Sequence, residues 1–148
     1  MTLRLGFLPS DFNPMLLILG EAEDFRRLGA ALRRFAADAA PVALDRLPEM
    51  IAGCALRLEM AAGEAAGLAA AGDGFVWRLD PLRAADFAAR AAALADPALR
   101  AGSDFLLCGG VEEVPVKLSR GEYTEDFLLP ALPGARGFDS KAANEREA

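Results

Sequence analysis

Large apolar residues alternate with polar or small residues at the start of the chain. Every second residue from Leu3 to Phe7 is apolar and bulky, which is the period of a half-buried strand, so a strand is predicted over residues 3–8. Turn-forming residues follow, and the continuous apolar run from Met15 to Leu19 is suited to an interior strand. The two strands are therefore predicted to form a hairpin.

A helix is predicted directly after Gly20. Acidic residues fall in its first turn, where their negative charge complements the exposed N–H groups and the helix dipole. Apolar residues then recur every three or four positions and form one stripe that faces the core: Phe25, Leu28, Leu32 and Phe35. We expect this first helix to extend to about Ala37.

Further strands are predicted where apolar and polar residues alternate between turn signals. They cover residues 41–47, 54–60, 75–80, 103–109 and 114–120. The glycines among the alanines of residues 61–71 predict a loop, because each glycine weakens a helix by about 1 kcal/mol. Proline has no N–H for a strand ladder, so Pro115 predicts that the last strand lies at a sheet edge.

A second helix is predicted from Pro81 to about Asp96. Asp80 is a preferred N-cap residue, and proline fits the first helical position because its missing N–H would be unpaired there in any case. The bulky residues of this helix are sparse, and the alanines between them predict close packing against a sheet or another helix. Its expected core residues are Leu82, Phe87 and Leu94.

These elements predict an α+β domain over residues 1–129. The favoured arrangement is a mainly antiparallel sheet of about six or seven strands with both amphipathic helices on one face, and a ferredoxin-like arrangement is the alternative. Residues 3–37 and 54–96 both follow the order strand, strand, helix, which raises the hypothesis of two ββα-like halves. In that hypothesis Phe25 and Leu32 correspond to Phe87 and Leu94. Residues 130–148 have little bulk to bury and are predicted to form a flexible tail.

The composition argues against most catalytic centres. The 148 residues contain no histidine, which is the side chain that titrates near neutral pH and the commonest metal ligand. The two cysteines, Cys54 and Cys108, lie far apart in strand-like patterns and are expected to be small buried side chains. The sequence has neither a glycine-rich phosphate loop nor the ligand spacing of a calcium loop. We therefore expect binding rather than catalysis, with no cofactor and no metal.

Charge and hydropathy restrict the expected partners and location. The net charge of −6 disfavours nucleic acid and anionic membranes, because both bind proteins through lysine and arginine. The N-terminal residues lack the apolar core of a secretory signal, and the longest bulky apolar run is far shorter than a membrane span. We expect a cytoplasmic protein whose cysteines stay reduced.

Four arginines gather on the predicted solvent side of the first helix. They are Arg26, Arg27, Arg33 and Arg34. Residues seven apart lie close together on a helix, so Arg26 falls near Arg33 and Arg27 near Arg34. These arginines are expected to lack acidic partners four residues away in the order that favours ion pairs. We interpret them as a docking face for an acidic protein, and the alternative is an ordinary solvated helix surface.

A second candidate site follows the last predicted strand. Arg120, Glu122 and Tyr123 are candidate binding residues, because exposed aromatic and arginine side chains often anchor protein interfaces. The alternative is structural: Gly121 makes a turn and Thr124 caps a short helix.

The predicted function is that of a small protein-binding module, such as an adaptor, assembly factor, inhibitor or immunity-type protein, whose partner is another protein. Homo-oligomerisation through an edge strand is a further hypothesis. Two other functions stay open. One is a hydrolase or isomerase that uses carboxylates with Tyr123 and Arg120 in a deep polar cleft. The other is a module that senses a small anion at the arginines of the first helix.

Overall fold

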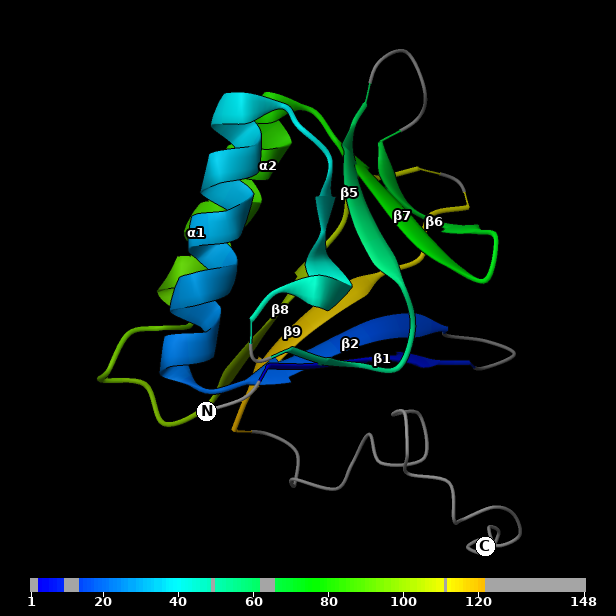
Figure 1. Cartoon of the computed structure of the whole chain (residues 1–148). Helices are drawn as coiled ribbons and strands as arrows, with labels where there is room; N and C mark the ends of the chain where they lie inside the picture. Colours follow the sequence, from blue (N-terminus) through cyan, green and yellow to red (C-terminus); the bar gives the residue numbers. More distant parts are fainter. Residues whose placement is uncertain (1–2, 10–13, 49, 62–65, 111, 122–148) are drawn as a thin grey trace, which may run out of the picture.

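Two helices and two β-sheets surround one hydrophobic core in the computed structural model of the protein (Figure 1). The structure describes residues 3–9, 14–48, 50–61, 66–110 and 112–121. The elements in these residues are, in chain order, β1 (Leu3–Leu8), β2 (Met15–Gly20), α1 (Ala22–Asp38), β3 (Val42–Ala43), the 3₁₀ turn η1 (Leu44–Arg46), β4 (Met50–Ala52), β5 (Leu56–Met60), β6 (Gly67–Ala71), β7 (Gly74–Leu79), α2 (Pro81–Ala93), β8 (Gly102–Leu106) and β9 (Val116–Arg120).

The α+β class is confirmed, but the strands form two mixed sheets instead of one. Sheet A has the order β4-β1-β2-β9-β8, and sheet B has the order β3-β5-β7-β6. The described residues thus contain nine strands, more than the six or seven predicted. Parallel pairing of β2 with β9 and of β5 with β7 joins distant segments, and a pattern of alternation along the chain does not report such pairing.

The chain folds as two topologically equivalent halves that exchange their last strands. The first half consists of the β1–β2 hairpin, α1 and the antiparallel pair β3–β5, and the second consists of the β6–β7 hairpin, α2 and the antiparallel pair β8–β9. The closing pair of each half joins the sheet of the other half, with β9 beside β2 and β5 beside β7. The second half therefore begins at Gly67, and not near residue 54 as the sequence suggested.

The two helices lie side by side and bury equivalent positions (Figure 1). Counted from the N-caps Glu21 and Asp80, the same positions are buried in both helices: Phe25, Leu28, Gly29, Leu32 and Phe35 in the first, and Ala84, Phe87, Ala88, Ala91 and Leu94 in the second. The predicted stripe of the first helix is therefore confirmed. A Cβ atom on Gly29 would lie 3.0 Å from the carbonyl oxygen of Ala88, so glycine permits the close approach of the helices.

The interior strand β2 is buried on both faces. Leu16 and Ile18 of β2 belong to the main core, whereas Leu17 and Leu19 form a smaller cluster on the other face of sheet A. This confirms the prediction of an interior strand from the continuous apolar run. The prediction that β9 is an edge strand is wrong, because β9 lies between β2 and β8. Pro115 precedes the strand, and its carbonyl accepts a hydrogen bond from the Leu16 N–H at 2.9 Å.

Aromatic side chains connect the layers of the core. The ring of Phe7 on β1 lies 4.9 Å from that of Phe75 on β7, so the two sheets meet through this pair. The buried indole of Trp77 lies 5.8 Å from the ring of Phe87 on α2. Phe87 was predicted to be a core residue, and its burial confirms this.

Several local predictions are wrong. Residues 67–71 of the predicted loop form β6, because the tight turn at Gly72 and Asp73 pairs this alanine-rich segment with β7. Residues 41–47 contain only the short β3 followed by η1, and β4 was not predicted. The second helix ends at Ala93, and Leu82 is 84% exposed because it lies on the outer side of the first turn. Residues 122–148, including the predicted tail, lie outside the described residues.

Neither helix in the described residues has both the length and the apolar character needed to span a membrane.

Candidate functional site

A groove beside α1 contains two of the arginines singled out from the sequence. Its lining residues, from here on the α1 groove, are Leu3, Arg27, Ala30, Ala31, Arg34, Leu47 and Pro48, and its volume is about 300 Å³. The helix supplies one wall, and the segment that follows η1 supplies the other. Alanine, leucine and proline side chains make most of its surface apolar.

The start of α1 fixes the first wall of the α1 groove. The Glu21 side chain caps the helix, and the Glu21 N–H donates a hydrogen bond to the Asp24 carboxylate at 2.8 Å. Asp24 is fully buried and accepts a hydrogen bond from the guanidinium of Arg27. Arg27 also donates to the carbonyl oxygen of Pro48 at 2.8 Å. This arginine therefore ties the helix to the opposite wall of the groove.

Arg33 and Arg34 are exposed, and neither makes a hydrogen bond or an ion pair with any part of the chain that the structure describes. Arg34 lines the α1 groove, and Arg33 is its neighbour on the solvent side. Consecutive residues of a helix point about 100° apart, so the two guanidinium groups present their positive charge in different directions. An incoming carboxylate can pair with either of them.

Two of the four arginines have acidic partners on α1 at a spacing of three residues, whereas the prediction considered only partners four residues away. Arg26 pairs with Glu23, and Arg27 pairs with Asp24, each three residues earlier on α1. The hydrogen bond and the charge of Glu23 raise the pKa of Arg26. The arginine face is therefore divided into two arginines bound by the helix itself and two, Arg33 and Arg34, that have positive charge to offer a partner.

The second half of the fold carries an arginine at the helix position that corresponds to an alanine of the α1 groove. Arg90 of α2 stands at the position of Ala31, counted from the N-caps. Its guanidinium donates to both carboxylate oxygens of Asp104, at 2.8 and 2.7 Å, and to the carbonyl oxygen of Phe105 at 2.9 Å. The hydrogen bond to Asp104 raises the pKa of Arg90. The alanine at this position of α1 lines the α1 groove.

Arg120 lies in a different place and is only 9% exposed. Its guanidinium donates to the carbonyl oxygens of Leu94 and Asp96, both at 2.8 Å, and so binds the carboxyl end of α2. The other two members of the second candidate site, Glu122 and Tyr123, lie outside the described residues. The structure therefore brings Arg27 and Arg34 together in one groove and places Arg120 against the end of the other helix.

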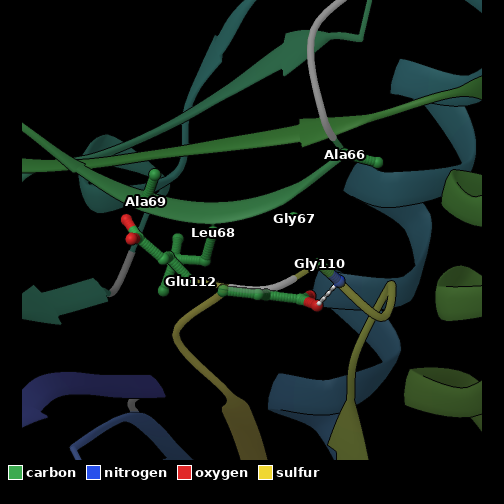
Figure 2. Close-up of a pocket in the computed structure, with 7 residues that line it drawn as sticks. Ala66, Gly67, Leu68, Ala69, Gly110 and Glu112 are labelled. Carbon is green, nitrogen blue, oxygen red and sulfur yellow. Dashed lines mark hydrogen bonds between the residues drawn. The ribbon is translucent and has the colours of Figure 1, made fainter.

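A smaller pocket of about 130 Å³ lies where β6 meets the loop before β9 (Figure 2). Its lining residues are Ala66, Gly67, Leu68, Ala69, Gly110, Glu112 and Glu113. In Figure 2 the side chain of Glu112 points toward Ala69 and away from the hydrogen bond at Gly110. The Glu113 carboxylate accepts hydrogen bonds from the N–H groups of Cys108, Gly109 and Gly110, at 2.6, 2.7 and 3.1 Å.

Glu113 is a structural residue that the sequence reasoning did not single out, because it looked like one solvated acid among many. Its carboxylate oxygens accept hydrogen bonds from backbone N–H groups and so hold the loop closed. Burial and the charge of Glu113 raise the pKa of the Cys108 thiol to about 11, which makes this thiol a poor nucleophile at neutral pH. Neither cysteine lies within a strand as predicted, and both are free and half-buried.

A third pocket, of about 350 Å³, lies between η1 and sheet B. Its charged groups have partners within the protein: Asp45 accepts a hydrogen bond from the Leu56 N–H at 2.9 Å, and Arg57 pairs with Glu59 at 3.0 Å. No group of three or more acidic or cysteine side chains in the described residues is arranged to hold a metal ion. Of these three pockets, the α1 groove is the one bordered by an arginine that has no partner in the described residues.

No protein-family model matches the chain, and neither a curated protein nor a solved structure shows significant similarity to it.

Proposed function

We propose that this protein is a small protein-binding module that docks an acidic segment of another protein on the α1 groove. The observation that carries the proposal is that Arg34 lines an apolar groove and, like the adjacent Arg33, is exposed and has no partner in the described residues. Arginine is favoured in interfaces because its planar group binds carboxylates in two-pronged fashion while its stem covers apolar surface.

The overall charge supports an acidic protein partner over nucleic acid. The chain carries a net charge of −6, so its surface as a whole repels a polyanion. A local positive patch on such a protein attracts a short acidic segment in one orientation, because the rest of the surface disfavours other contacts. The proposal includes the roles of adaptor, assembly factor, inhibitor or immunity-type protein, and a cytoplasmic location.

The geometry gives less support to the two other functions considered. A hydrolase or isomerase needs acidic groups that converge in a cleft, whereas the carboxylate of Glu113 is held by backbone N–H groups and Arg120 by backbone carbonyls. A sensor of one small anion needs arginines that converge on a point. Arg33 and Arg34 are consecutive on a helix and therefore diverge by about 100°, which suits an extended ligand better.

Reversal of the two arginine charges tests the proposal. The partner is first captured from the native host and purified, and its affinity is then measured for the unchanged protein and for Arg33→Glu/Arg34→Glu. We expect at least a tenfold loss of affinity and a weaker dependence on salt in the variant. Arg57→Glu/Arg100→Glu changes the net charge equally outside α1 and should retain binding. Equal loss in both variants, or none in the first, would contradict the proposal.

A further inference from the structure

We infer that the docked segment inserts one apolar side chain into the α1 groove and places a carboxylate, two residues away along an extended chain, on Arg34. This inference rests on the proposed function and specifies the chemistry of the partner. It also predicts a short recognition signature, in which one apolar residue and one acidic residue are separated by a single residue of any kind.

The apolar part of the inference follows from the floor of the α1 groove. Ala30 and Ala31 form the helix side, and Leu3, Leu47 and Pro48 form the rest. Leu3 is only 2% exposed, so the floor is continuous with the core. A volume of about 300 Å³ is at the lower end of ligand pockets, which suits one aliphatic side chain better than a large cofactor.

The acidic part of the inference follows from the position of Arg34. Arg27, at the other end of the groove, already binds Asp24 and Pro48 and serves as part of the wall. Arg34 has no such partner in the described residues and is exposed. A carboxylate from the partner would form with Arg34 the kind of pair that Arg90 forms with Asp104 in the second half.

The spacing follows from helix and strand geometry. Ala30 and Arg34 are four residues apart on α1, which corresponds to about 6 Å along the helix axis. Residues two apart in an extended segment point to the same side and are separated by about 7 Å. An extended segment along α1 can therefore fill the groove with one side chain and reach Arg34 with the next side chain on that side.

Peptides test this inference directly on the full-length protein. The first peptide, acetyl-Gly-Leu-Ser-Glu-Ser-Leu-Gly-amide, places leucine two residues from glutamate on both sides, so that either chain direction satisfies the signature. A second peptide replaces both leucines by serine, and a third replaces glutamate by glutamine. Binding is followed as shifts of backbone amide NMR signals at millimolar peptide. The first peptide is expected to shift signals of residues 27–34, and each replacement is expected to weaken binding about tenfold or more.

Filling the groove gives a matched pair of variants. Ala30→Trp places a large side chain in the α1 groove, whereas Ala89→Trp places the same side chain at the equivalent exposed position of α2. Thermal unfolding establishes that both variants are folded. We expect only Ala30→Trp to lose binding of the leucine-containing peptide.

The outcomes separate the two proposals. Loss of the peptide in Ala30→Trp but not in Ala89→Trp supports the groove. Equal binding of the leucine and serine peptides, retention in Ala30→Trp, or no shifts in residues 27–34 with any peptide would overturn the inference. If the purified partner is lost on Arg33→Glu/Arg34→Glu but retained by Ala30→Trp, recognition of an acidic segment by the two arginines stands, and insertion of an apolar side chain into the α1 groove fails. If neither Arg33→Glu/Arg34→Glu nor Ala30→Trp weakens binding of the partner, both proposals are overturned.

Discussion

Ala31 of α1 and Arg90 of α2 occupy the same position counted from the helix N-caps, and the surfaces beside the two helices differ at this position. Arg90 reaches across to Asp104 of β8, whereas Ala31 lines the α1 groove. In the second half, the arginine at this position is paired within the protein. On α1, the alanine at this position lines the groove that we propose as a docking site.

The pair formed by Arg90 and Asp104 should stabilise the fold measurably. Both side chains are about one-third exposed, at 36% and 31%, so solvent screening reduces their coupling to about 1 kcal/mol. Urea unfolding of Arg90→Ala, Asp104→Ala and the double variant measures this coupling energy. Asp38→Ala, at the exposed end of α1, serves as the control and should change the free energy of unfolding by less than about 0.5 kcal/mol. Strictly additive effects of the first two substitutions would show that the pair contributes nothing.

Replacement of Arg120 should destabilise the protein. Arg120→Met keeps the stem of the side chain but removes the hydrogen bonds to the carbonyl oxygens of Leu94 and Asp96. We expect the free energy of unfolding to fall by about 2–3 kcal/mol, because these hydrogen bonds come from a charged donor and their acceptors lie at the end of a helix. Arg100→Met, an exposed arginine of the neighbouring loop, should have little effect. Unchanged stability of Arg120→Met would show that the contacts are dispensable.

The thiol of Cys108 should react slowly with alkylating reagents. Its pKa is raised from 9.0 to about 11, so at pH 8 the reactive thiolate is about 100-fold scarcer than for a thiol of ordinary pKa. Iodoacetamide labelling of the Cys54→Ser variant isolates Cys108. The rate should increase about tenfold per pH unit until pH approaches 11, and the unfolded variant should react faster at pH 8. A rate that levels off near pH 9 in the folded variant would contradict this assignment.

The sequence identified most elements but not their partners. The spacing of Phe25, Leu28, Leu32 and Phe35 sufficed for α1, because one apolar stripe requires one buried face. The parallel contact of β2 with β9 joins residues one hundred positions apart, and no local pattern encodes it. The prediction from Pro115 failed for a similar reason, because the proline lies just outside the ladder that it was expected to interrupt.

The candidate site was recognised in part. The arginine pattern located Arg27 and Arg34 on one side of the helix, since seven residues make almost two complete turns. The groove could not be predicted from the sequence. Its second wall comes from Leu47 and Pro48, whose distance from α1 depends on the tertiary fold. Arg120 looked exposed in the sequence but is buried against backbone carbonyls, which are acceptors that every residue carries and no motif reveals.

A charge-swap experiment with the purified partner tests the central claim most directly. Arg34→Glu should weaken binding by about tenfold or more, and replacement of one acidic residue of the partner by arginine should weaken binding to the unchanged protein similarly. The account predicts that the two variants bind each other better than either binds its unchanged partner. If no acidic residue of the partner restores binding to Arg34→Glu in this way, the claim that Arg34 receives a carboxylate is contradicted.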